Sequence, residues 1–137
     1  MAAKLNPYVT FPGTAREAMD FYASVFGGTP AFDTFGGMGE TDPALADKIM
    51  HASLEKASGF TLMASDTPPG MEHQPGGSIS VSLSGDDADD LRSWWQQLSE
   101  RGTVTMALEK QVWGDEFGMC VDPYGVSWMV NLAQPQG

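Results

Sequence analysis

The sequence predicts an α+β protein made of two tandem βαβββ modules. Two segments with helical spacing of apolar residues are each preceded by one strand-like segment and followed by three. The two halves also match at an offset of 72 residues. This match favours an internal duplication, although a strand-turn-helix pattern common to many proteins is the alternative explanation. We expect a single domain over residues 1–137, with internal modules at about 1–68 and 77–134, because a half of this chain is short for an independent core.

The first module contains a helix from Thr14 to Phe26. Its apolar residues recur every three or four positions, Thr14 and Glu17 fit a capping box, and Gly27 follows the last turn. A strand at 8–13 precedes the helix. Strands are expected after it at 30–35, 49–56 and 60–65.

The second module contains a helix from about Asp87 to Arg101. Carboxylates crowd its positive N-terminal end, and Gly102 follows its last turn. A strand at 80–85 precedes it, and strands at 104–108, 117–121 and 126–132 follow, the last two joined by the turn Asp122–Gly125. The stretches 36–47 and 66–77 are rich in Gly, Pro and Asp, and we expect irregular loops there.

Charge and composition exclude several classes of protein. Eighteen acidic and seven basic residues give a net charge of −11, which repels nucleic acid and anionic lipid, so we expect neither as a partner. No stretch approaches the eighteen or so apolar residues of a membrane span, and the N-terminus lacks a signal-peptide core. The lone Cys120 fits a reducing compartment, and we expect a cytoplasmic protein.

Alternation along the strands assigns side chains to two different faces of the sheet. One face is apolar and should carry the helices: Val9, Phe11, Met50, Ala52, Leu54, Phe60, Leu62, Ile79, Val81, Leu83, Val126, Trp128, Val130 and Leu132. The other is polar but almost uncharged: Asn6, Tyr8, Thr10, His51, Ser53, Glu55, Thr61, Met63, Ser65, Ser78, Ser80, Ser82, Ser127, Met129 and Asn131. A solvent-exposed face is the alternative, but such a face usually contains Lys, Glu and Arg. The composition therefore favours a concave ligand pocket.

Two sets of residues on or near this polar face are candidates for chemistry. His51 and Glu55 share one side of a strand, where the imidazole could act as a general base; a structural histidine is the alternative. Trp113 and Asp115 could bind a cationic or amphipathic ligand, although core packing alone would also explain a tryptophan at this position. The predicted ligand-binding residues are Asn6, Tyr8, His51, Met63, Ser78, Ser80, Trp113, Asp115, Met129 and Asn131.

Four segments in order carry a family resemblance. They are Ala18–Tyr22 followed by Phe26–Gly28, the strand-turn-strand run 49–66, the segment 113–119, and the run 122–131 that begins Asp-Pro-Tyr-Gly. Together they resemble the glyoxalase/bleomycin-resistance/dioxygenase superfamily, also called vicinal oxygen chelate proteins, and within it the PhnB-like branch. The resemblance implies a glyoxalase-like fold, in which the two modules form a curved mixed-sheet cup with the helices on its outer face. It also implies a homodimer.

The same resemblance bears on metal binding. Metal-dependent members place His, Gln or Glu on the first, fourth, fifth and eighth strands, and the matching positions here are Asn6 (or Pro7), Met63, Ser78 and Met129. None of these is a good ligand for Zn, Ni, Fe or Mn, so we predict no cofactor and no usual metal site.

The sequence therefore favours a PhnB-like protein that binds a small organic molecule in the cup, and leaves open whether it is an enzyme. One alternative is a glyoxalase-type lyase, isomerase or dioxygenase whose metal is held by unusual ligands that include His51 and Glu55. Another is a drug-sequestering resistance protein whose negative charge attracts cations.

Overall fold

The computed structural model describes residues 5–55, 60–68, 71–73 and 78–134. The chain divides into two compact units, Met1–Gln74 and Pro75–Gly137, each with its own sheet. No helix within the described ranges combines the length and the apolar character needed to cross a membrane.

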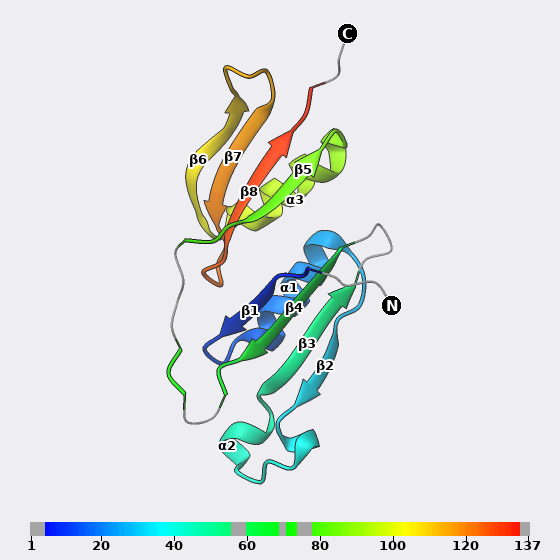
Figure 1. Ribbon diagram of the computed structural model, residues 1–137, viewed down its shortest axis with the longest axis vertical. Coiled ribbons are helices and arrows are strands. Elements are labelled where there is room, and N and C mark those ends of the chain that lie inside the picture. The colour runs from blue at the N-terminus through cyan, green and yellow to red at the C-terminus, as the bar shows by residue number, and fades with distance from the viewer. Residues whose placement is uncertain (1–4, 56–59, 69–70, 74–77, 135–137) are drawn as a thin grey trace. The chain divides into compact units, whose positions relative to one another are not determined.

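Each unit follows the order β-α-β-β-β (Figure 1). The first unit contains β1 (Tyr8–Phe11), α1 (Ala15–Phe26), β2 (Ala31–Thr34), the 3-10 helix η1 (Gly36–Met38), α2 (Pro43–Ala46), β3 (Ile49–Glu55) and β4 (Thr61–Asp66). The second contains β5 (Val81–Gly85), α3 (Ala88–Glu100), β6 (Thr103–Lys110), β7 (Glu116–Val121) and β8 (Ser127–Leu132).

The two sheets share one topology. Their strand orders are β1-β4-β3-β2 and β5-β8-β7-β6, so each places its first strand beside its last. In both sheets this pair is parallel and the other pairs are antiparallel. The predicted α+β class with two tandem βαβββ modules is confirmed, and each sheet is open rather than closed into a barrel.

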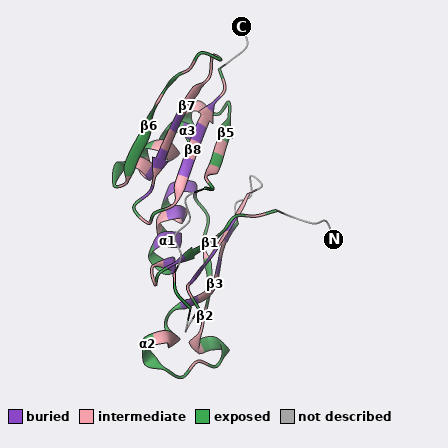
Figure 2. Cartoon of the chain, turned by 60° about the vertical axis from the view of Figure 1, so that its left-hand side comes forward, coloured by how far each residue is buried: buried purple, intermediate pink, exposed green. Residues whose placement is uncertain are grey.

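Each helix covers one face of its own sheet. Helix α1 packs against β3 and β4, and its apolar stripe of Ala15, Ala18, Met19, Tyr22, Val25 and Phe26 is buried. Helix α3 packs on the second sheet, where Leu91 joins Val130 and Leu132 in a buried cluster. Figure 2 shows the resulting alternation of burial along β8, whereas the edge strand β6 is almost wholly exposed.

The capping box predicted at the start of α1 is wrong. The side chain of Thr14 makes no cap hydrogen bond, and its backbone (φ −111°, ψ 15°) lies outside the extended region usual for an N-cap residue. Instead the buried carboxylate of Asp66, at the end of β4, accepts hydrogen bonds from Ala15 N at 2.9 Å and from Ile49 N at 2.8 Å. A distant strand therefore anchors this helix, and local spacing could not indicate it.

Helix α3 is capped locally, as its acidic start predicts. The side chain of Asp87 accepts a hydrogen bond from Asp90 N at 3.1 Å. The predicted turn at Asp122–Gly125 is also present, with Gly125 N donating to Asp122 O at 3.1 Å. The buried Asp122 carboxylate adds a bond from Trp128 Nε1 at 2.8 Å, which ties this turn to the core.

Two stretches differ from their predictions. Residues 36–47 are not irregular throughout, because Asp42 caps the short helix α2 by accepting from Ala44 N at 3.0 Å. Strand β5 begins only at Val81, so Ile79 is not on the apolar covered face and is 83% exposed. The predicted loop at 66–77 lies partly outside the described residues.

Cys120 is buried on β7, and burial together with the nearby Asp122 charge raises the pKa of its thiol to about 11. A thiol with so high a pKa stays protonated at neutral pH, which makes Cys120 a poor nucleophile.

Candidate functional site

Each sheet has a face that its helix does not cover, here called the open face. Its side chains alternate with the buried core positions along each strand. In the first unit the open face includes Tyr8, Thr10, His51, Ser53, Glu55, Thr61 and Met63. In the second it includes Ser82, Ser84, Phe117, Met119, Val121, Ser127, Met129 and Asn131.

His51 lies beside two other polar side chains on the open face of the first unit. Its Nδ1 atom is 3.5 Å from the hydroxyl oxygen of Tyr8, and the two rings are 5.7 Å apart. Asp33 on β2 is its cross-strand neighbour. Cross-strand partners project on the same side of a sheet, so the carboxylate of Asp33 lies on the same face as the imidazole and the phenol.

Glu55 is not part of this group. It lies four residues along β3 from His51, about 13 Å away at the rise of a β-strand, and it pairs with Thr61. The sequence prediction therefore chose a carboxylate on the same strand and missed Asp33. Only the pairing of β2 with β3 could have indicated Asp33.

Met63 occupies the middle of the same face. It pairs with Tyr8 on β1 and with Ser53 on β3, and its side chain is half-buried. Asn6 is also half-buried but lies before β1 begins. Three predicted ligand-binding residues, Tyr8, His51 and Met63, are thus brought together by adjacent strands.

A row of thioethers crosses the second sheet. Met129 on β8 pairs with Ser82 on β5 and with Met119 on β7, and Met119 pairs with Met106 on β6. Neither Met106 nor Met119 was among the predicted binding residues, although alternation along β7 indicates the latter. The predicted residues Ser78 and Ser80 precede β5, and Ser78 is exposed.

Trp113, Asp115 and Asn131 meet at one end of the same face. Asn131 Nδ2 donates to Asp115 Oδ2 at 2.9 Å, and Gln134 N donates to Asp115 Oδ1 at 3.3 Å. The rings of Trp113 and Phe117 meet edge to face at 5.9 Å, and Phe117 pairs with Asn131 across β7 and β8. Trp113 and Phe117, here called the aromatic corner, and the carboxylate of Asp115 therefore lie beside the row of methionines.

The residues present do not fit a divalent metal at the positions that the superfamily uses. The matching positions supply an amide, two thioethers and a hydroxyl, whereas Zn, Ni, Fe and Mn prefer imidazole, thiolate and carboxylate ligands. Within the described ranges, no three His, Cys, Asp or Glu side chains gather closely enough to hold a metal ion. The geometry thus gives no support to a shared site for His51 and Glu55.

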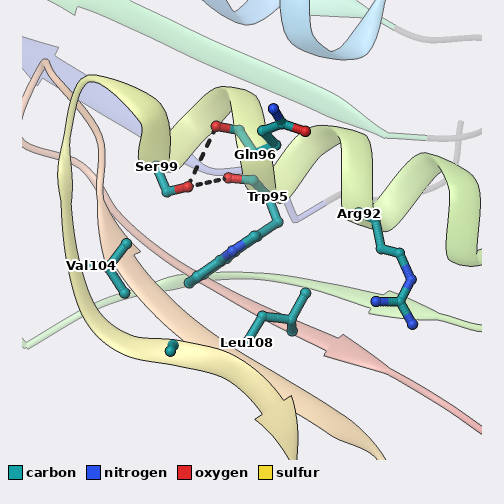
Figure 3. Close-up of a pocket in the computed structure, with 7 residues that line it drawn as sticks. Arg92, Trp95, Gln96, Ser99, Val104 and Leu108 are labelled. Carbon is teal, nitrogen blue, oxygen red and sulfur yellow. Dashed lines mark hydrogen bonds between the residues drawn. The ribbon is translucent and has the colours of Figure 1, made fainter.

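A separate cavity of about 470 Å³ lies on the helix side of the second unit (Figure 3). It is lined by Arg92, Trp95, Gln96, Ser99, Val104, Ala107 and Leu108, from α3 and β6. Two of its polar side chains are already engaged: Ser99 Oγ donates to Trp95 O at 2.7 Å, and Arg92 pairs with Glu116. None of the predicted binding residues lines it.

Comparison with known proteins places these features in a family. Residues 4–130 match the Glyoxalase/Bleomycin resistance protein/Dioxygenase superfamily. Protein Mb0911c from Mycobacterium bovis is 33% identical, with 96% of this chain and 82% of that protein covered.

Two solved structures are similar over almost the whole chain. Protein PA1353 from Pseudomonas aeruginosa is 38% identical with a TM-score of 0.88, and 98% of this chain and 100% of that chain are covered. The PhnB protein from Bacillus cereus is 25% identical with a TM-score of 0.72, at 96% and 100% coverage. The chain therefore belongs to the glyoxalase/bleomycin resistance protein/dioxygenase superfamily, with a PhnB protein among its structural neighbours.

Proposed function

We propose that this PhnB-like chain binds a small organic molecule on the open faces of its modules, without a divalent metal at the usual positions. The observation that carries the proposal is the composition of these faces. Met63 on β4 and Met129 on β8 lie in register on these faces, at positions where metal-dependent relatives need an imidazole or a carboxylate.

These residue types suit an organic ligand. Met63, Met119 and Met129 offer flexible, polarisable surface that adapts to an apolar body. Ser82 and Asn131 add hydrogen-bonding groups at fixed positions on neighbouring strands. A mainly apolar surface with a few convergent polar groups is typical of small-molecule sites.

The methionine methyl groups provide the test. In protein labelled with ¹³C at these methyls, titration with neutral probes such as benzyl alcohol and with compounds from a small-molecule library should shift the signals of Met63, Met119 and Met129. Met19 belongs to the buried stripe of α1, so its signal should stay fixed and serves as the internal control. Shifts confined to the exposed Met38 or Met71, or no shifts at all, would refute the proposal.

Acid-base catalysis is a second candidate, because the Tyr8 hydroxyl and Asp33 adjoin His51. The proton spectrum of each bound compound, followed over hours, distinguishes the two functions. Conversion of the compound that His51→Ala abolishes, with methyl shifts retained, would establish an enzyme. Binding with no conversion in either protein supports a binding protein.

We also propose a homodimer, in line with the family resemblance. The eight-residue edge strand β6 exposes Val104 and Met106, and an uncovered apolar edge favours pairing with another strand. Sedimentation velocity at micromolar concentration should give the mass of two chains; a monomer would contradict this. The cytoplasmic location stays a prediction.

A further inference from the structure

The charges of the second unit are divided between the two sides of its sheet. Glu116 pairs with Leu132, whose side chain is buried on the side of α3, and with Lys110 across the hairpin. Arg92 on α3 donates to both carboxylate oxygens of Glu116. Arg101, the third basic residue of this unit, is the C-cap residue of α3.

The open side of the same sheet carries carboxylates without basic partners. Glu109 pairs with Phe117 on this side, and Asp115 is held by Asn131. Within the described part of the chain, neither acidic group forms an ion pair. Asp115 accepts one hydrogen bond on each oxygen, and a carboxylate has about four acceptor positions, so it retains capacity for a further donor.

An exposed aromatic surface adjoins these carboxylates. Trp113 is 57% exposed although its ring contacts Phe117 edge to face. The face of an indole attracts cations more strongly than any other side-chain ring. Trp113 lies in the turn closed by the bond from Gly114 N to Gln111 O at 3.0 Å, and Asp115 follows that turn, its O atom accepting from Gln111 N at 2.8 Å. Phe117, which contacts Trp113, is the cross-strand partner of Asn131, and Asn131 donates to Asp115.

We propose that Trp113, Phe117 and Asp115 form a subsite for an organic ammonium group. This inference rests on the proposed function and names the class of its ligand: a small molecule with a quaternary or protonated amine joined to an apolar body. The ammonium group contacts the aromatic corner and the uncompensated carboxylate, and the apolar body extends along the row Met119–Met129.

Two probes of the same shape test the role of the charge. Choline and 3,3-dimethylbutan-1-ol differ in a single atom, the central nitrogen or carbon. Choline should bind about tenfold more tightly at low ionic strength, with shifts of the Met119 and Met129 methyl signals. Raising the ionic strength from about 0.01 M to about 1 M should weaken choline alone, because only its binding is screened.

Neighbouring carboxylates on opposite sides of the sheet supply matched variants. Asp115→Asn should remove the preference for choline, since it removes the charge at the subsite. Glu116→Gln changes the net charge of the protein equally but acts on the helix side, so it should leave the preference intact. Trp113→Ala should weaken choline at least tenfold and the neutral alcohol less.

The outcomes separate this inference from the proposed function. Equal binding of the two probes, or no binding of choline while neutral compounds still shift the open-face methionines, overturns the ammonium subsite and leaves the proposed function standing. If Glu116→Gln lowers the preference as much as Asp115→Asn does, the effect belongs to the overall charge and the subsite is rejected. Absence of open-face shifts with every compound rejects both.

Discussion

Replacing Asp66 with alanine is expected to lower the free energy of unfolding of the first unit by about 3 kcal/mol or more. The Asp66 carboxylate is the buried acceptor for the N–H groups of Ala15 and Ile49, at 2.9 and 2.8 Å. Alanine leaves both donors without this partner, and each unsatisfied buried donor costs about 1–3 kcal/mol. Urea denaturation followed by circular dichroism measures the loss, and amide hydrogen exchange should accelerate at Ala15 and Ile49.

Two further variants make this prediction specific. Asp66→Asn retains one acceptor oxygen, so it should cost less than alanine. Asp87→Ala removes an exposed helix cap in the other unit and should cost about 1 kcal/mol. If Asp66→Ala costs no more than Asp87→Ala, the long-range cap does not have the importance given to it here.

Replacing Gly118 with alanine is expected to destabilise the second unit by about 2–3 kcal/mol. A Cβ atom at Gly118 would lie 2.8 Å from the Cη2 atom of Trp95 and 2.9 Å from the Cα atom of Leu108. The tryptophan ring can move, but the β6 backbone at Leu108 resists displacement because β6 is paired with β7 on both sides of it, at Met106 and Glu109. All four tryptophans lie in the second unit, so tryptophan fluorescence during urea unfolding measures this effect directly.

Gly37→Ala is a control in the first unit, where no tryptophan lies, so its unfolding is followed by circular dichroism. Its Cβ would meet only the Thr34 hydroxyl oxygen at 3.3 Å, and we expect a loss below about 1 kcal/mol. Combining Gly118→Ala with Trp95→Phe should recover part of the loss, since it shortens one of the two opposing groups. If Gly118→Ala unfolds at the same urea concentration as the wild-type protein, then β6 and β7 separate more easily than their packing suggests.

The sequence predicts the elements of this fold well because their signals are local. The apolar stripe of α1 and the acidic start of α3 each lie within one segment, and both helices are found where expected. The anchor at Asp66 acts across 51 residues, so local spacing led instead to a capping box at Thr14. The face of Ile79 was misassigned because alternation does not indicate where β5 begins.

The candidate site likewise combines features that local patterns predict with features that depend on strand pairing. Alternation places Met63 and Met129 on the open faces, as expected from their strands. Which strands adjoin is a property of the sheet, so the neighbour of His51 is Asp33 rather than Glu55. The bond from Asn131 to Asp115 likewise depends on the pairing of β7 with β8.

The different anchors of the two helices also set an order of events during synthesis. Helix α3 meets its cap at once, because Asp87 immediately precedes it. Helix α1 must wait until 51 more residues have been added after Ala15 before Asp66 exists. On a growing chain, the N-terminal end of α1 therefore stays unanchored until β4 emerges, so the first module completes its structure only as a whole.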